Sequence, residues 1–561
     1  MTFSSYQFIL IFVPVTIAGF WFTARSADRR WAMGWLILTS LVFCACAGVK
    51  TLAVIVTSVA GNYLCARLML SGNSKCLRLR AAVFSVGVCL NIMLLVYFKR
   101  EAAILTFSNL VLGTRFDLAR IVFPLGVSFL TFQMIGFLAD IYRRRLKEVR
   151  CLDYLLFSFF FPRVVAGPIV RYGELAPQFA RFTSRTLREH APVAICLFSI
   201  GLFKKAFIAD GLAPFVTQAF DLMPADEAPS AITAWFASLA FSLQIYFDFS
   251  GYTDMALGVA RLFGVRLPMN FNSPYKAKSI VEFWSRSHIT LTLFLTEYVF
   301  SPLMKYLLQF RLSKALLTRA PNQFKHLLMT VMICPAIFVT TEVSGLWHGI
   351  SWPFICWGTL HGVYLAVNQI WRALRPLVWS DRRSYERVMN PAGLVLTLAC
   401  STVALVFYRA NSVGSALSML SGMAGLNGFL PTEWALLNRL GIDTWSILDF
   451  QSIREFSWII VLFLVVTLMP NSMEILKGFQ PALNFHVNPV PSTVSMARSA
   501  GQEAITSPTN ASPDWGAIRF IQRFMREGIR LNRVTASLIA LACALGILAL
   551  NDGGNFIYAR F

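Results

Sequence analysis

The chain has 561 residues, of which 56% are hydrophobic and only 14% are charged. Soluble globular proteins carry about 25% charged residues because their surface faces water, so this composition excludes an ordinary soluble fold. The net charge of +22 lies mostly in segments between apolar stretches, which favours membrane orientation and contact with anionic lipids over nucleic-acid binding.

The first apolar run, residues 6–22, is followed by a basic cluster at Arg25, Arg29 and Arg30. A cleaved signal peptide carries its positive charges before its apolar segment, so the order here predicts a retained membrane helix. The positive-inside tendency places the basic cluster in the cytoplasm and the N-terminus outside.

Further apolar runs follow, and with shorter ones they predict roughly 11–14 membrane-embedded helices, at about 20 residues for a full span. The longer runs cover residues 31–49, 52–70, 81–98, 191–203, 232–247, 327–340, 392–407, 458–468 and 534–550. The predicted fold class is therefore all-α and polytopic. The stretch 157–172 contains Pro162, Gly167 and Pro168, which predicts either a re-entrant segment lining a cavity or a kinked span.

One polar segment divides the chain. Residues 477–533 are rich in Pro, Ser, Thr and Asn, and they separate a transmembrane core at 1–476 from a final apolar segment at 534–561. The first part of this segment predicts a flexible connector. Its second part, 515–533, spaces apolar residues helically among arginines, which is typical of an amphipathic helix on a membrane surface.

Several polar side chains fall within or beside the apolar runs. The 11 cysteines include no Cys-x-x-Cys pair, which argues against a disulfide framework or a zinc cluster, and we expect no metal. Acidic residues at membrane depth line cavities or form ion pairs, and we favour ion pairs here, for example Asp140 with Arg143. The acidic residues concerned are Asp140, Asp248, Asp254, Glu297 and Glu342.

Four of the six histidines lie between residues 288 and 361. His326 sits in a polar stretch, whereas His288, His348 and His361 have apolar, aromatic neighbours. Ionisable groups at membrane depth are costly and mark function by default. On one straight helix, His348 and His361 would lie roughly 140° apart, so unless Pro353 kinks the helix we expect one to be catalytic and the other structural.

Two stretches resemble a known family. They are residues 239–303, LAFSLQIYFDFSGYTDMALGVARLFGVRLPMNFNSPYKAKSIVEFWSRSHITLTLFLTEYVFSPL, and residues 344–365, SGLWHGISWPFICWGTLHGVYL. They resemble the signature region and the invariant-histidine helix of the membrane-bound O-acyltransferase family, in the bacterial branch of alginate O-acetyltransferase membrane subunits and cellulose O-acetylases. Shorter matches are PLGVSFLTFQ (124–133), AGPIVRY (166–172), GLFKKAFIAD (201–210), VFYRA (406–410), MPNSMEIL (469–476) and the aromatic C-terminus at 556–558.

The resemblance implies a fold with re-entrant segments around a central tunnel. It implies that His348 is the catalytic histidine and His288 the second polar position of the site. Glycines 345 and 349 would let backbone or substrate approach His348 closely. The residues that we expect to contact substrate are Trp284, Arg286, Trp347 and Ser344.

The sequence departs from the usual family pattern at three places beside these histidines. Ser287 stands where alginate-type members have Trp, Thr296-Glu297 where they have Arg-Asp, and Val343-Ser344 where they have Leu-Gly. These changes leave both histidines in place, so they concern the acceptor or partner more than the reaction.

The reaction implied by the resemblance moves an acetyl group from cytosolic acetyl-CoA to a hydroxyl group. The acceptor would be an extracytoplasmic polysaccharide of alginate or cellulose type, or a periplasmic acetyltransferase partner, and subunits of a polysaccharide-synthesis complex would be further partners. The membrane would be the bacterial inner membrane. Neutral histidine suits a general base, so His348 is assigned that role, with His288 orienting it or bonding the oxyanion. The alternatives are a transporter and a haem-binding electron carrier.

Overall fold

The computed structural model describes residues 1–26, 28–71, 77–111, 126–222, 228–429, 450–483 and 533–550. Within these ranges the regular secondary structure is entirely helical, which confirms the predicted all-α class. The surface helix predicted at 515–533, most of the connector before it and the aromatic C-terminus lie outside the described residues.

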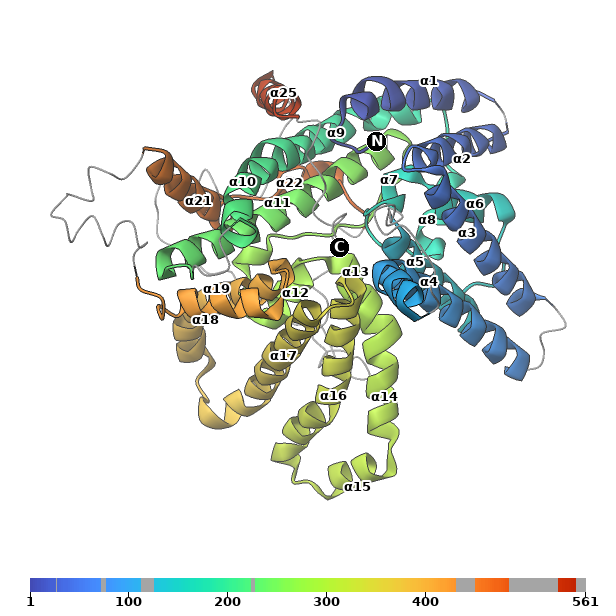
Figure 1. The fold of residues 1–561 in the computed structure, drawn as a ribbon. Coiled ribbons are helices and arrows are strands. Elements are labelled where there is room, and N and C mark those ends of the chain that lie inside the picture. Colours follow the sequence, from blue (N-terminus) through green and yellow to red (C-terminus); the bar gives the residue numbers. More distant parts are fainter. Residues whose placement is uncertain are drawn as a thin grey trace.

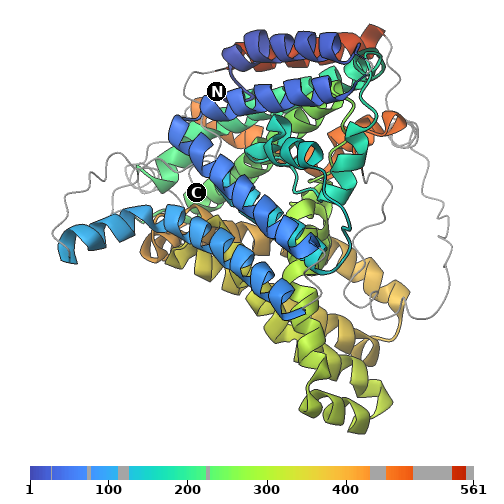
Figure 2. The same cartoon turned by 90° about the vertical axis from the view of Figure 1, so that its right-hand side faces the viewer.

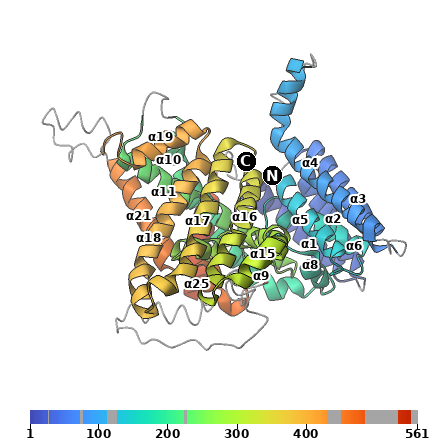
Figure 3. The same cartoon turned by 90° about the horizontal axis from the view of Figure 1, so that it is seen from below.

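The N-terminal helices form one side of the molecule (Figure 1). Each packs against the next in the chain from α1 to α5, and the last part of α4 extends away from the other helices (Figure 3). These elements are η1 (Phe8–Phe12), α1 (Val13–Thr23), α2 (Arg30–Ala45), α3 (Val49–Leu70), α4 (Leu77–Val111) and α5 (Val127–Tyr142).

The proline- and glycine-containing stretch breaks into short helices, α6 (Cys151–Phe159), α7 (Phe161–Val164) and α8 (Tyr172–Phe179). Phe160 and Phe161, at the first break, are fully buried. Because irregular backbone at membrane depth needs protein around it, this burial favours the re-entrant interpretation over a kinked span.

A pair of long helical segments runs through the centre of the molecule (Figure 1). α9 (Thr186–Leu202), the π-helical η3 (Phe203–Ala209) and α10 (Asp210–Phe220) follow one another, and α11 (Ala231–Leu262) packs along them. A Cβ atom on Gly201 would come within 2.6 Å of the Gly251 carbonyl oxygen, so only glycine permits this crossing. α25 (Arg533–Leu548) packs on the outer side of α9.

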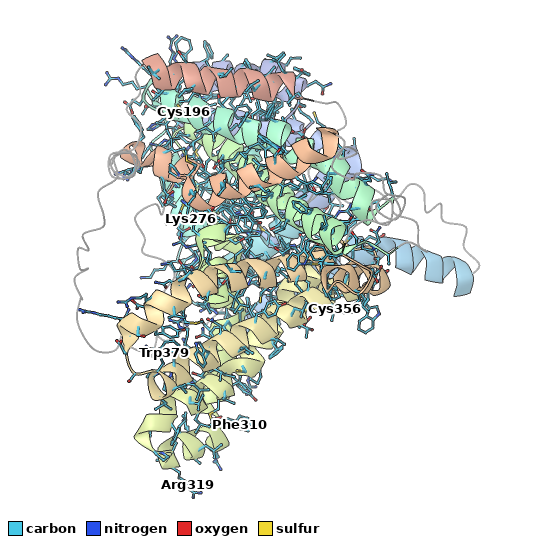
Figure 4. The ribbon with its side chains drawn as sticks, turned by 90° about the vertical axis from the view of Figure 1, so that its left-hand side faces the viewer. Cys196, Lys276, Phe310, Arg319, Cys356 and Trp379 are labelled. Atoms are coloured by element: carbon cyan, nitrogen blue, oxygen red, sulfur yellow. The ribbon has the colours of Figure 1, made fainter. Side chains whose placement is uncertain are left out.

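The remaining helices surround the centre and extend from it. α14 to α16 project from the body with α15 at the tip (Figures 1 and 2), and Figure 4 shows Phe310, Arg319 and Trp379 together towards this end. These elements are η4 (Pro274–Lys276), α12 (Ile280–Arg286), α13 (Ile289–Leu295), η5 (Thr296–Phe300), α14 (Ser301–Gln309), α15 (Arg311–Arg319), α16 (Asn322–His348), α17 (Trp352–Val378), α18 (Arg382–Arg409), α19 (Val413–Met423), α21 (Phe450–Leu468), α22 (Ser472–Ile475) and η6 (Lys477–Phe479).

The described residues include six helices long and apolar enough to cross a membrane and six shorter apolar helices. This set agrees with the predicted number, and the protein is a multi-pass membrane protein. In α11, 67% of the most apolar window is buried inside the protein, against 17% for α4. α11 is therefore a central span, whereas α4 faces mainly lipid.

Contacts between helix ends define two sides of the molecule. On one side, Glu297 in η5 pairs with Arg145 after α5 and with Arg171 before α8. On the other side, Arg409 at the end of α18 pairs with Asp221 after α10. Since α1 to α5 alternate in direction, the basic connection between α1 and α2 lies on the first side, which we expect to face the cytoplasm.

Candidate active site

His348 and His361 belong to two different helices. α16 ends at His348 and α17 begins at Trp352, so the single straight helix assumed in the sequence argument was wrong. The chain turns back between them, and both rings approach the indole of Trp357, at centroid distances of 5.3 and 4.7 Å. The separation of roughly 140° predicted for the two histidines on one straight helix therefore does not occur.

Two glycines allow the tight α16–α17 hairpin. A Cβ atom on Gly345 would lie 2.5 Å from the Phe354 carbonyl oxygen, and one on Gly349 would lie 2.3 Å from the Phe354 ring. The expected close approach is therefore made by the protein's own backbone and by a ring of α17. It holds His348 at the buried end of α16.

His348 is only 4% exposed, and both its ring and its backbone are held by polar groups. Its Nδ1 lies 3.1 Å from the hydroxyl of Tyr408 on α18. Its carbonyl oxygen accepts a hydrogen bond from the Lys99 ammonium group on α4 at 2.6 Å. The ring is thus fixed by α18 and the backbone by α4.

His288 precedes α13 in a left-handed backbone conformation, with φ 44°. Few residues other than glycine adopt this region, although Asn, Asp and His do so more often than the rest, and such backbone concentrates at functional sites. The ring is 4% exposed, and its Nδ1 lies 3.3 Å from Oδ1 of Asn270. The turn therefore points a buried imidazole at a defined acceptor.

His361 is held by Trp284. The indole Nε1–H of Trp284 donates to His361 Nδ1 at 3.2 Å, and the ring is 2% exposed. An indole N–H can only donate, so Nδ1 is the acceptor and a neutral His361 carries its proton on Nε2.

The three histidines line one cavity of about 70 Å³. Trp284, Trp357 and Tyr408 are also part of its wall. A second cavity of about 150 Å³ shares Trp284, Trp357 and His361 with the first, and it continues past Ser344 to Gln369 on α17. Since the same three residues line both spaces, they form the partition between a small histidine chamber and a larger apolar chamber.

The four expected substrate contacts occupy different places. Trp284 lines both chambers and Ser344 lines the larger one. Trp347 is not among the residues lining either chamber, because its indole donates to the Ser128 carbonyl at 3.0 Å and stacks on Phe132. It therefore packs behind the histidines.

Arg286 is likewise engaged within the protein. Its guanidinium pairs with Glu282 at 2.9 Å and donates to the Asn272 carbonyl at 3.1 Å, and it lines neither chamber. These contacts stabilise α12, which carries Trp284. Direct contact between Arg286 and the substrate stays a prediction.

The acidic residues in the apolar runs are mostly ion-paired, as favoured above. Asp248 and Asp254 pair with Lys205 and Lys204 at 2.6 and 2.7 Å. The expected partner of Asp140 was wrong, because the carboxylate pairs with Arg145 at 3.2 Å rather than with Arg143. Glu297 pairs with arginines as described above. Glu342 instead accepts the Thr359 hydroxyl at 2.6 Å.

Sequence reasoning missed three residues that hold the histidines. Tyr408 lies inside the quoted motif VFYRA and Asn270 inside the quoted stretch 239–303, and these matches were the available signal. Lys99 follows an apolar run beside Arg100, and no local pattern distinguishes it from a cation at a helix end.

Comparisons with known proteins identify the family of the chain. The model of MBOAT, the membrane-bound O-acyltransferase family, matches residues 139–320. A peptidoglycan O-acetyltransferase from Helicobacter pylori is 35% identical over 455 residues, which cover 76% of this chain and 80% of the relative.

Two further relatives differ in what their names say they modify. A probable alginate O-acetylase from Pseudomonas aeruginosa is 31% identical over 470 residues, covering 81% of this chain and 82% of the relative. A teichoic acid D-alanyltransferase from Streptococcus thermophilus is 28% identical over 265 residues, covering 46% of this chain and 60% of the relative. Peptidoglycan is not among the acceptors predicted from the sequence, which were polysaccharides of alginate or cellulose type.

Proposed function

Since the chain belongs to the membrane-bound O-acyltransferase family, we propose that it transfers an acetyl group from cytosolic acetyl-CoA to a hydroxyl of an extracytoplasmic polysaccharide. The protein is an O-acyltransferase. Its donor, its acceptor and its catalytic residues are proposed here. The observation that carries it is the chamber in which His288, His348 and His361 meet inside a membrane domain.

The proposed general base is His348. A hydroxyl has a pKa far above neutrality, so it needs a base when it attacks the thioester, and general-base help is worth about 10²–10⁴-fold. To accept a proton at Nε2, His348 must carry its own proton on Nδ1. The 3.1 Å contact allows Nδ1–H to donate to the Tyr408 hydroxyl, so Tyr408 supports this tautomer.

The proton balance closes within the site. The acceptor oxygen forms a bond to the acetyl carbon, the thioester C–S bond breaks, and the hydroxyl proton passes through His348 to the departing thiolate. The sequence assigned His288 to orient His348 or to bond the oxyanion. We propose that His361, which carries its proton on Nε2, donates to the developing oxyanion instead.

The chamber dimensions support entry of the acetyl end alone. One water needs about 10–15 Å³, so a cavity of about 70 Å³ accepts an acetyl thioester but not a whole nucleotide or a sugar chain. We propose that the donor arm occupies the larger apolar chamber and that its acetyl group reaches the histidines past Trp284.

The proposed acceptor is a glycan of the bacterial envelope, at the outer face of the inner membrane. The names of the relatives support this class, since one modifies peptidoglycan and another alginate. A periplasmic acetyltransferase that passes the group on, within a polysaccharide-synthesis complex, is the proposed partner.

The test is radiolabelled acetyl transfer from acetyl-CoA in membranes, with peptidoglycan, alginate and cellulose fragments as acceptors. We expect His348→Ala to lose at least 100-fold in rate and His288→Ala to lose less. His326→Ala is the matched control, because His326 lies on α16 with His348 but at its opposite end. Undiminished transfer by His348→Ala would remove the assigned base, and transfer to none of the glycans would remove the acceptor class.

A further inference from the structure

Asn270, in the loop between α11 and α12, has a fixed amide orientation. The backbone N–H of Thr290 donates to Asn270 Oδ1 at 3.2 Å. The Thr290 hydroxyl accepts from the backbone N–H of Ile169 at 3.1 Å and is 2.9 Å from the same Oδ1, to which it donates. A backbone N–H can only donate, so the amide oxygen must face Thr290.

This orientation determines the tautomer of His288. Its Nδ1 lies 3.3 Å from the same oxygen, and an amide oxygen can only accept. The proton of a neutral His288 is therefore on Nδ1, and Nε2 carries the lone pair. The backbone strengthens the link, because the N–H of Ile289 donates to the Asn270 carbonyl at 2.9 Å.

Asn270 also lines a small cavity. Asn270 is 1% exposed, and its Nδ2 has no hydrogen-bond partner among the described residues. Asn270 and Thr253 both line a cavity of about 10 Å³, and the buried Thr253 hydroxyl has no partner in the described part of the chain either. Leaving a buried donor unsatisfied costs about 1–3 kcal/mol. The unsatisfied Asn270 amide nitrogen and Thr253 hydroxyl therefore indicate that a ligand binds between them.

The opposite wall of the cavity contains an ion pair. Lys204 on η3 binds Asp254 of α11 at 2.7 Å and the Ser472 hydroxyl at 3.2 Å, and all three line the space. Because Lys204 already neutralises Asp254, a cation is disfavoured. A cavity of about 10 Å³ fits one water molecule and no organic group.

We propose that this cavity binds one water molecule, which links Asn270 to the Lys204–Asp254 pair, and that Asn270 is a positioning residue which keeps the proton of His288 on Nδ1. The water accepts from Asn270 Nδ2 and donates to Asp254 and Thr253. The amide of Asn270 would thus be held at both ends, its oxygen by Thr290 and its nitrogen by the water bound to the Lys204–Asp254 pair. The link to catalysis rests on the proposed function.

The tautomer is tested without activity, by ¹⁵N NMR of histidine-labelled protein, with His288→Gln to assign the signal. We expect an Nδ1–H ring in the wild type and in Asn270→Asp, which keeps the acceptor, and loss of that preference in Asn270→Leu. Asn91→Leu is the control, because Asn91 is buried and bonds Asn62. An Nδ1–H signal that survives in Asn270→Leu would overturn the positioning role.

Two further measurements test the proposal: the kinetics of acetyl transfer and a density map of the protein. We expect Asn270→Leu to lower kcat about tenfold with KM little changed, and Asn270→Asp to retain a higher kcat than Asn270→Leu. If the kcat of Asn270→Leu equals or exceeds that of Asn270→Asp, Asn270 acts only through packing, and the positioning role is refuted. A density map that resolves waters should show one peak bonded to Asn270 Nδ2, and a dry cavity would refute the water site. Wild-type protein without acetyl transfer would refute the proposed function and leave the NMR result unaffected.

Discussion

At the scale of single residues, the hydroxyl of Tyr408 lies 3.1 Å from Nδ1 of His348, where it can accept the ring proton. Tyr408→Phe keeps the packing against Trp357 but removes the acceptor for Nδ1–H. A neutral hydrogen bond is worth about 1 kcal/mol, so we expect kcat to fall about 5–10-fold with KM nearly unchanged. Initial rates of acetyl transfer at varied acetyl-CoA check this.

Tyr385→Phe is the matched control for that substitution. Tyr385 lies on α18 with Tyr408, at the opposite end of the helix, where its hydroxyl accepts from Trp371. Its rates should equal the wild type. A Tyr408→Phe enzyme with full kcat would show that the tautomer of His348 is set elsewhere.

The sequence identified the histidines but not the groups that hold them. His288 and His348 stand out because histidine is rare in apolar runs, and the structure brings them to one chamber. Asn270 and Tyr408 are ordinary polar residues in their motifs, and their importance comes from contacts across 18 and 60 residues of sequence. Periodicity reports only neighbours along one element, so it cannot detect such pairs.

At the scale of elements, the α16–α17 hairpin depends on Gly345. In Gly345→Ala the new methyl group would meet the Phe354 carbonyl oxygen at 2.5 Å, so the two helices must separate. Overpacking costs about 1–3 kcal/mol, and we expect both a lower thermal midpoint in detergent and a loss of transfer activity, because α16 carries His348.

Gly61→Ala on α3 is the control for this substitution. A Cβ atom there meets no atom within 4 Å, and alanine is favoured over glycine in a helix by about 0.5–1 kcal/mol. Its midpoint should equal or exceed that of the wild type. A Gly345→Ala protein as stable and active as Gly61→Ala would contradict the close-packed hairpin.

Helix positions were predictable from hydropathy, whereas helix breaks were less so. The apolar run 232–247 locates α11 correctly, but the helix extends to Leu262, because its later polar side chains are buried inside the protein instead of facing lipid. Conversely, the break between α16 and α17 consists of the sequence Gly-Ile-Ser. This sequence is compatible with either a turn or a continuous helix, and the packing on Phe354 favours the turn.

At the scale of the whole molecule, the directions of the helices and the distribution of charge indicate the same side as the cytoplasmic one. Basic residues gather at α15 and at the connection between α17 and α18, and Figure 4 shows Arg319 and Trp379 of these elements at the same end. The Glu297 cluster with Arg145 and Arg171 adds further cations on the side assigned to the cytoplasm. An anionic donor would approach the larger chamber from that side.

Two native cysteines test this orientation. Cys46, at the end of α2, and Cys151, at the start of α6, are both exposed thiols. α2 starts on the side assigned to the cytoplasm and ends on the other, whereas α6 follows the basic residues after α5. In spheroplasts, a membrane-impermeant maleimide should therefore label Cys46, and Cys151 should react only after permeabilisation.

The variants Cys46→Ser and Cys151→Ser assign each labelling event to its thiol, and mass spectrometry of the peptides reads out the result. Because α1 to α5 alternate in direction, labelling of Cys151 but not Cys46 in intact spheroplasts would mean that the whole protein has the opposite orientation. It would move every basic connection to the outside, against the positive-inside tendency, and it would place the larger chamber on the wrong side for a donor made in the cytosol.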